Sequence, residues 1–188
     1  MTIRPYRPSD HNACHALWGE LTEHRSRLHG DANRTVRERS GPRGAAELGG
    51  QSAPGPDAGA GFEEYLTQLN LSGMWVAEHA EFGVAAFAGL VLDGRTGEVD
   101  PVVVTESLRG RGIGRTLLAR VAEEAVRRGL RRLTISPPVR DRAALHSLHA
   151  SGFDTIATVT LSYDLRAGAG GAPAGVDTLD LFDLRFKV

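Results

Sequence analysis

The sequence lacks the features that mark secreted, membrane-spanning and nucleic-acid-binding proteins. Its 188 residues include one cysteine, Cys14, which rules out an internal disulfide framework and fits a reducing compartment. No apolar run approaches the roughly 18 residues of a transmembrane helix, and residues 1–7 lack the apolar region of a signal peptide. The net charge of -1 gives no basic signature for nucleic acid. We therefore expect a cytoplasmic protein with neither membrane nor nucleic-acid partners.

The length and the small residues predict a single domain, residues 1–188, that contains two flexible loops. A chain of this length buries a sizeable core without disulfides. Residues 40–61 are rich in Gly, Pro, Ala and Ser, so they offer too little apolar area to offset the entropy of ordering. Residues 166–175 have a similar composition. The first loop is either a lid over a substrate site or an inserted linker with no role.

Apolar patterning predicts alternating strands and helices along the chain. Helices are expected after Pro8-Ser9-Asp10, where a short polar side chain can cap the start, and again from Phe62, with Tyr65 on its apolar side. Asp141 can cap a further helix, whose inward side chains are expected to be Ala144, Leu145 and Leu148. Pro101 cannot donate to a sheet ladder and therefore predicts a bulge or an irregular start in its strand. The predicted strands are Thr2–Arg7, Met74–Glu78, Val84–Leu92, Glu98–Thr105, Leu130–Ser136, Asp154–Leu165 and Asp177–Val188.

The segment from residue 102 to residue 129 organises the rest of the chain. Three consecutive valines predict a buried strand, a glycine-rich turn follows, and Gly129 ends the next helix. A strand that leads through glycines into a helix directs several unpaired N–H groups at one point, which predicts a phosphate site. One face of the predicted helix is apolar and consists of Leu117, Leu118, Val121, Ala122, Ala125 and Val126.

The spacing of glycine and arginine narrows the kind of phosphate ligand. A P-loop needs Gly-Lys-Ser/Thr, and residues 113–116 are Ile-Gly-Arg-Thr. The dinucleotide fingerprint G-x-G-x-x-G fails in both frames, because its sixth position is Arg or Leu. The spacing that fits is R-x-x-G-x-G, formed by Arg109, Gly112 and Gly114. The alternative is an ordinary tight turn in which glycine serves packing.

In this form the segment resembles the acetyl-CoA pyrophosphate loop of the GCN5-related N-acetyltransferases, the GNAT superfamily. Residues 141–153 are similar to a later family motif, N-x-x-A-x-x-x-Y-x-x-x-G-F, with Asp141 at the Asn position, Ala144 at Ala, and Gly152-Phe153 at its end. The resemblance implies an α/β (α+β) GNAT fold. Such a fold has a mixed, mostly antiparallel central sheet with a splayed strand pair, flanked by helices.

The resemblance also implies that acetyl-CoA is the cosubstrate. In the family, the backbone of the splayed strand holds the acetyl carbonyl and the pantetheine arm, and the glycine-rich turn holds the pyrophosphate. The cofactor-binding residues implied in this chain are Val102, Val103, Val104, Arg109, Gly110, Arg111, Gly112, Ile113, Gly114, Arg115 and Asp141.

The reaction implied is direct transfer of the acetyl group to a primary amine of a small molecule or peptide, in a ternary complex. The amine arrives as an ammonium ion, so a carboxylate or a water chain must take its proton. Asp100 is the first candidate for this base and Glu98 the second, and the alternative for both is solvation at a strand end. The backbone N–H of Val104 is the expected oxyanion donor.

One departure from the family pattern keeps other functions open. Leu148 stands where the family often has a tyrosine that protonates the departing thiolate, and leucine has no proton to give. His149 lies about 100° round the helix and does not simply replace it. One alternative is a non-catalytic acetyl-CoA-binding sensor or interaction module. Another is a binder of a different phosphate or nucleotide.

The histidines and the cysteine suggest no further chemistry. His11 and His15, and likewise His146 and His149, have helical spacing, but a solvated surface explains both pairs, so we expect no metal. Cys14 lies in the first helix, away from the cofactor turn, which argues against an acyl-enzyme. Family members often exchange or pair their last strands across a dimer, so the resemblance also implies a homodimer.

Overall fold

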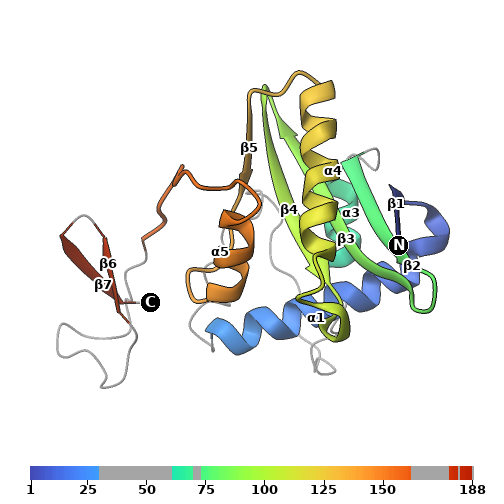
Figure 1. Cartoon of the computed structure of the whole chain (residues 1–188), viewed down its shortest axis with the longest axis horizontal. Helices are drawn as coiled ribbons and strands as arrows, with labels where there is room; N and C mark the ends of the chain where they lie inside the picture. The colour runs from blue at the N-terminus through green and yellow to red at the C-terminus, as the bar shows by residue number, and fades with distance from the viewer. Residues whose placement is uncertain (30–60, 70–72, 162–177, 182, 188) are drawn as a thin grey trace, which may run out of the picture.

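The computed structural model describes residues 1–29, 61–69, 73–161, 178–181 and 183–187. Its centre is a five-stranded sheet in the order β1-β2-β3-β4-β5 (Figure 1). The first four strands are antiparallel neighbours, and β5 runs parallel to β4, which confirms the predicted mixed, mostly antiparallel sheet. The strands are β1 (Thr2–Pro5), β2 (Met74–His79), β3 (Gly83–Asp93), β4 (Thr96–Val104) and β5 (Arg132–Ile135).

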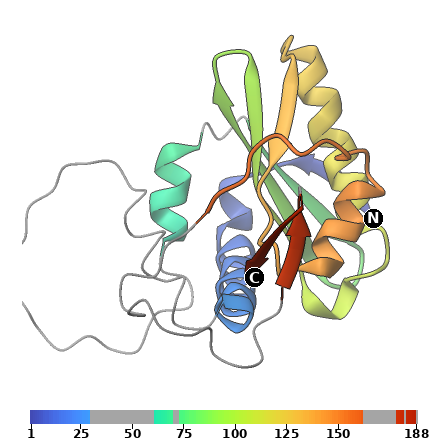
Figure 2. The same cartoon turned by 90° about the vertical axis from the view of Figure 1, so that its left-hand side faces the viewer.

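Helices cover both faces of the sheet (Figure 2). On one face lie α1 (His11–His29), which follows the short 3-10 helix η1 (Pro8–Asp10), and α3 (Phe62–Gln68). On the other face lie α4 (Ile113–Arg127) and α5 (Arg142–His149), and a second 3-10 helix, η4 (Glu106–Leu108), follows β4. Each face has its own apolar core. Cys14, Phe62, Phe87 and Val103 belong to the first, and Leu90, Val99, Leu117 and Val121 to the second. No described helix is long and apolar enough to cross a membrane.

Strand β4 contains the bulge that Pro101 predicts. Val102 pairs with Ala88 of β3 and Val99 pairs with Leu90, so β4 has one more residue than β3 across this interval. Because of the extra residue, Val99 and Val102 both pack on the α4 side of the sheet, although they are an odd number of positions apart. The bulge therefore changes which side chains of β4 face each helical layer.

The pairing of β4 with β5 ends just before the bulge. It runs from Thr96 opposite Arg132 to Val99 opposite Ile135, whereas β4 continues to Val104 alongside β3. Residues 100–104 thus have β3 on one side and, within the described chain, no ladder partner on the other. This arrangement confirms the predicted splayed strand pair.

Helix α4 ends as its sequence predicts. Gly129 has a φ of +71°, its N–H donates to the Val126 carbonyl at 2.9 Å, and the Leu130 N–H donates to the Ala125 carbonyl at 3.0 Å. These two bonds form a Schellman motif, which satisfies the last carbonyls of the helix. Glycine is favoured at this position because other residues adopt a positive φ at a cost.

Fewer side chains of α4 and α5 are buried against the sheet than predicted. Val126 is 76% exposed and Leu145 is 39% exposed, so neither belongs to the core. Each lies about 100° round its helix from a side chain that faces inward, which turns it toward solvent. In α4 the buried position falls instead on Glu124, whose carboxylate pairs with Arg120, Arg127 and Arg128.

The predictions for the C-terminal tail are wrong. Residues 154–161 contain no strand and all of their side chains are exposed, because no other strand pairs with this segment in the described chain. The last segment is a hairpin of β6 (Thr178–Leu181) and β7 (Leu184–Lys187) instead of one strand. Asp183 has a φ of +61°, a backbone conformation that Asp tolerates in tight turns. The two predicted flexible loops lie outside the described residues, apart from Gly61.

Candidate functional site

The start of α4 is open. Its N-cap residue, Gly112, has a φ of +80° and offers no side-chain cap. The first helical bond joins the Thr116 N–H to the Gly112 carbonyl at 3.1 Å, so the amides of residues 113–115 precede it. A Cβ added at Gly110 or Gly112 would meet no atom of the described residues within 4 Å. The first turn of α4 therefore has no side-chain cap on its backbone N–H groups, and the helix dipole favours negative charge there.

Two side chains fix this turn to the rest of the fold. Arg109 donates from Nε to the Val104 carbonyl at 3.0 Å, which ties the turn to the end of β4. Glu20 of α1 accepts the Thr105 hydroxyl and the Glu106 N–H, both at 2.9 Å. The carboxylate of Glu20 is thus used for positioning the turn and is not free to attract a cationic substrate.

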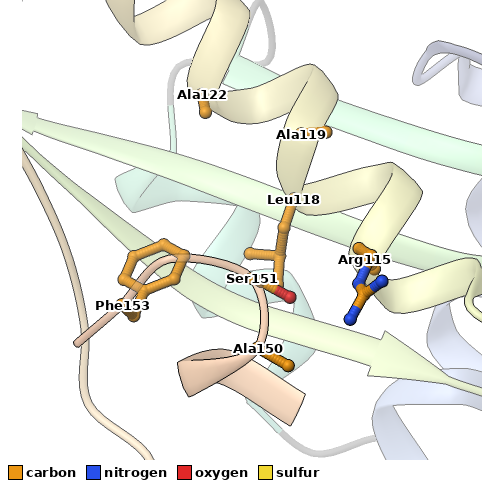
Figure 3. Close-up of a pocket in the computed structure, with 7 residues that line it drawn as sticks. All are labelled: Arg115, Leu118, Ala119, Ala122, Ala150, Ser151 and Phe153. Atoms are coloured by element: carbon orange, nitrogen blue, oxygen red, sulfur yellow. The ribbon is translucent and has the colours of Figure 1, made fainter.

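A shallow depression of about 240 Å³ continues from the start of α4 toward the end of α5 (Figure 3). Figure 3 shows that its lining side chains come from α4 and from the turn that follows α5. They are Arg115, Leu118, Ala119, Ala122, Ala150, Ser151 and Phe153. Complete small-molecule pockets commonly measure about 300–1,000 Å³, so this depression suits only one end of a larger ligand.

The splayed end of β4 lies beside the turn. A Cβ at Gly114 would lie 3.6 Å from Val104 Cγ2 and 4.0 Å from Val102 Cγ1, so these two side chains face α4. Val103 is 3% exposed and belongs to the core on the α1 side. The valine side chains therefore serve packing, and what the splay leaves without a ladder partner is the backbone edge of residues 102–104 that faces away from β3. On this strand the Val104 carbonyl already accepts a hydrogen bond from Arg109.

Both candidate bases lie close to the splay, and each has a partner. The Asp100 carboxylate lies at the bulge, 3.5 Å from the guanidinium of Arg25 in α1. Glu98 pairs with Thr134 of β5 in the ladder, one pair before the strands separate, and its carboxylate accepts a hydrogen bond from the Ser136 hydroxyl at 3.0 Å. The fold thus brings both predicted carboxylates to the place where β4 and β5 separate.

Asp141 caps α5 as predicted, since its Oδ1 accepts the Ala144 N–H at 2.9 Å. Its Oδ2 lies 2.8 Å from His24 Nε2, and this bond joins α5 to α1. Both carboxylate oxygens are therefore engaged. His24 was missed in the sequence, because nothing in the local pattern shows which helix it will meet.

Leu148, which replaces the family's usual tyrosine, is an ordinary core residue. It is 8% exposed and packs in the α4-side cluster. A phenol does lie elsewhere in the buried interior, since α3 contributes Tyr65, which is also 8% exposed. The sequence shows only that Tyr65 shares the apolar side of its helix and gives no signal for the place its hydroxyl reaches.

The structure shows how Cys14 and the histidines are used. Cys14 is fully buried, and burial raises the pKa of its thiol to about 12, so it remains protonated and unreactive. His11 Nε2 lies 3.0 Å from a carboxylate oxygen of Glu63. Within the described ranges, no three metal-ligating side chains come together.

Comparisons with known proteins agree with this geometry. The sequence model of the Acetyltransferase (GNAT) family matches residues 46–153, more than half of the chain. The comparison with curated proteins gives no match.

Three solved structures show the similarity of fold. A mutant of the BH1408 protein from Bacillus halodurans has a TM-score of 0.64 and 16% identity over 88% of this chain and 99% of that one. A ribosomal-protein-alanine N-acetyltransferase from Brucella melitensis has a TM-score of 0.56 and 22% identity, over 81% and 83%. The glucosamine-6-phosphate N-acetyltransferase from Arabidopsis thaliana has a TM-score of 0.55 and 15% identity, over 87% and 97%. On the family match, this chain belongs to the GNAT family of acetyltransferases.

Proposed function

We propose that the chain transfers an acetyl group from acetyl-CoA to a primary amine of a small molecule or peptide. The observation that carries this proposal is the open, glycine-lined start of α4 next to the splayed end of β4. The first feature suits a diphosphate, and the second suits an extended arm bound through backbone groups. The similar structures named acetyltransferases support the reaction class, while the acceptor remains our proposal.

The residues present fit acetyl-CoA, which would supply an activated thioester at the splay. The amides from Gly110 to Arg115 would bind the pyrophosphate, with positive charge from Arg111 and Arg115 around it. The depression lined by Leu118 and Phe153 would take the nucleotide end. The backbone of residues 102–104 would hold the arm. A contact from Asp141 would require that His24 release its carboxylate.

The chain's own groups would then prepare the amine. We propose Asp100 as the group that receives the ammonium proton, directly or through water, with Glu98 as the second candidate. Asp100 is the better placed, because it lies at the bulge beside the unpaired part of β4. The backbone N–H of Val104 is the proposed donor to the oxyanion that develops on the acyl oxygen as the amine attacks the acyl carbon. The C–N bond forms as the C–S bond breaks, and CoA would leave as its thiolate.

Two measurements test this proposal. Titration with CoA, ATP and NAD should show CoA binding at least about tenfold more tightly than either nucleotide, because each nucleotide lacks the arm that β4 would hold. A thiol-release assay with acetyl-CoA against a panel of amines should then show turnover. Binding of CoA without turnover on any amine would favour the sensor, which the buried Leu148 makes a specific alternative. Binding of ATP or NAD but not CoA would overturn the assignment of the ligand.

A further inference from the structure

The hydroxyl of Tyr65 is buried and has no partner within the described chain. Its ring packs among the aromatic side chains of the α1 side, with ring centroids 4.9 Å from Trp18 and 6.3 Å from Phe62. The residue is 8% exposed, and its oxygen accepts or donates no hydrogen bond in the described ranges. A buried hydroxyl without a partner is costly, by roughly 1–3 kcal/mol, so native proteins rarely keep one without a reason.

The Tyr65 hydroxyl lies against strand β3. It lies against Gly89 of β3, so close that a Cβ at residue 89 would overlap it. The same Cβ would lie 2.8 Å from the Asp100 carbonyl oxygen. The Tyr65 hydroxyl therefore reaches the bulge of β4, at the level where β5 separates from the sheet. A side chain at residue 89 would fill the space that the hydroxyl now occupies.

The surroundings keep this phenol protonated. Burial raises the pKa of Tyr65 above its ordinary value, and the negative charge of Asp100 adds to the shift. The Asp100 carboxylate in turn lies 3.5 Å from the guanidinium of Arg25. The bulge thus brings together a neutral hydroxyl that can donate and a carboxylate that can accept.

We propose that Tyr65 is the hydrogen-bond donor of the acceptor site and that it recognises an oxygen atom of the acceptor. This inference rests on the proposed function. A donor bonded to the amine nitrogen would occupy the lone pair needed for attack, so the partner of Tyr65 is a different atom of the acceptor. The substrate class is therefore an amine that also carries a hydroxyl or carbonyl oxygen, as in an amino alcohol or an amino-acid amide.

The decisive variant is Tyr65→Phe, with Tyr6→Phe as its matched control. Tyr6 packs against the same core cluster but is half-buried, and its hydroxyl is not assigned to the site. The acceptor probes are two pairs with equal numbers of heavy atoms: 2-aminoethanol with propylamine, and alaninamide with 3-methylbutan-2-amine. Binding of each probe in the presence of CoA is measured by calorimetry, and kcat and KM are measured by thiol release.

We expect the wild type and Tyr6→Phe to prefer the oxygen-bearing member of each pair by about tenfold or more. Tyr65→Phe should lose that preference by weakening the oxygen-bearing probes alone, with CoA affinity unchanged. Its unfolding midpoint should equal or exceed that of the wild type, because the variant removes a buried polar group without breaking a bond.

The outcomes separate this inference from the proposed function. If amines are acetylated but Tyr65→Phe does not change the preference for oxygen-bearing probes, the inference is overturned and the acetyltransferase activity stands. A preference in binding that Tyr65→Phe removes, with no turnover, supports the inference and overturns the activity. A midpoint clearly lower for Tyr65→Phe than for Tyr6→Phe shows that the hydroxyl already has a partner in the chain and overturns the inference. Failure of every probe to bind overturns it as well.

Discussion

Helices α4 and α5 lie on the same side of the sheet, yet they begin in opposite ways. The first turn of α5 is closed by its own chain, since Asp141 accepts the Ala144 N–H and also binds His24. The first turn of α4 begins at Gly112, which has no side chain to offer. A helix start satisfied by a carboxylate holds the fold together, whereas one left open is available for an anion from outside.

The largest effect, a loss of CoA affinity, is expected from giving α4 a capping carboxylate like that of α5. Gly112→Asp places a carboxylate beside the free amides, where it competes with and repels a pyrophosphate. We expect CoA affinity to fall at least about 100-fold by calorimetry, which corresponds to about 2.7 kcal/mol. The matched control is Gly129→Asp, because Gly129 has a similar positive φ at the opposite end of the same helix. Equal losses in both variants would show that backbone strain alone is responsible.

A second helix start closed by a carboxylate is that of η1, the 3-10 helix that leads into α1. Asp10 is 5% exposed, accepts the Arg7 N–H at 2.8 Å, and pairs with two nitrogens of Arg4 at 2.7 and 2.8 Å. Asp10→Asn keeps an acceptor but removes the charge, so it should lower the free energy of unfolding by about 2 kcal/mol. Urea titration of the two proteins at neutral pH measures the difference.

The same pair has a pH dependence with a definite sign. The Arg4 guanidinium lowers the pKa of Asp10 below its ordinary value. A carboxylate with a lowered native pKa stabilises the fold above its unfolded pKa of about 3.9 and loses that contribution as the pH falls. The gap between wild type and Asp10→Asn should therefore stay constant above about pH 5 and narrow below about pH 4. A gap that does not change with pH would show that charge has no part in it.

A smaller effect on stability is expected from removing the N-cap of α5. Asp141→Ala removes the cap and the partner of His24, which should lower the free energy of unfolding by about 1 kcal/mol. His24→Ala, which keeps the cap, is the control and should cost less. If Asp141→Ala leaves stability unchanged but weakens CoA binding, Asp141 belongs to the cofactor site and the contrast between the two helices fails.

The smallest effect is expected at Gly114. Its added Cβ would make ordinary contacts with Val104 and Val102, so Gly114→Ala fits the fold and should raise the free energy of unfolding by about 0.5 kcal/mol. Thermal unfolding of the variant beside the wild type measures this change. A clear loss of stability would mean that the space between α4 and β4 is tighter than these distances indicate.

Local patterns predicted the parts of the molecule that local chemistry decides. Gly129 predicted the end of α4, Pro101 the bulge in β4, and Asp141 the cap of α5, because each acts on neighbouring backbone. Arg109 and the glycines of the turn likewise located the open start of α4, although its phosphate ligand is still a proposal.

What the sequence could not predict depends on distant partners. The segment that begins at Asp154 has a strand-like pattern but no neighbouring strand to pair with in the described chain. Glu124 is buried in place of Val126 because three arginines surround it. Tyr65 became a candidate only when Gly89, from another strand, was found beneath its hydroxyl. The assignment to a single domain and the homodimer stay predictions.

The complete burial of Cys14, the chain's one sulfhydryl, has a practical consequence. A protonated thiol closed off from solvent reacts slowly with aromatic disulfide reagents, so the folded protein adds little background when free CoA is detected by such a reagent. Unfolding exposes that group and restores its reactivity. One colorimetric chemistry can therefore record catalytic turnover in the native state and, in the absence of substrates, count the fraction of molecules that have lost their structure.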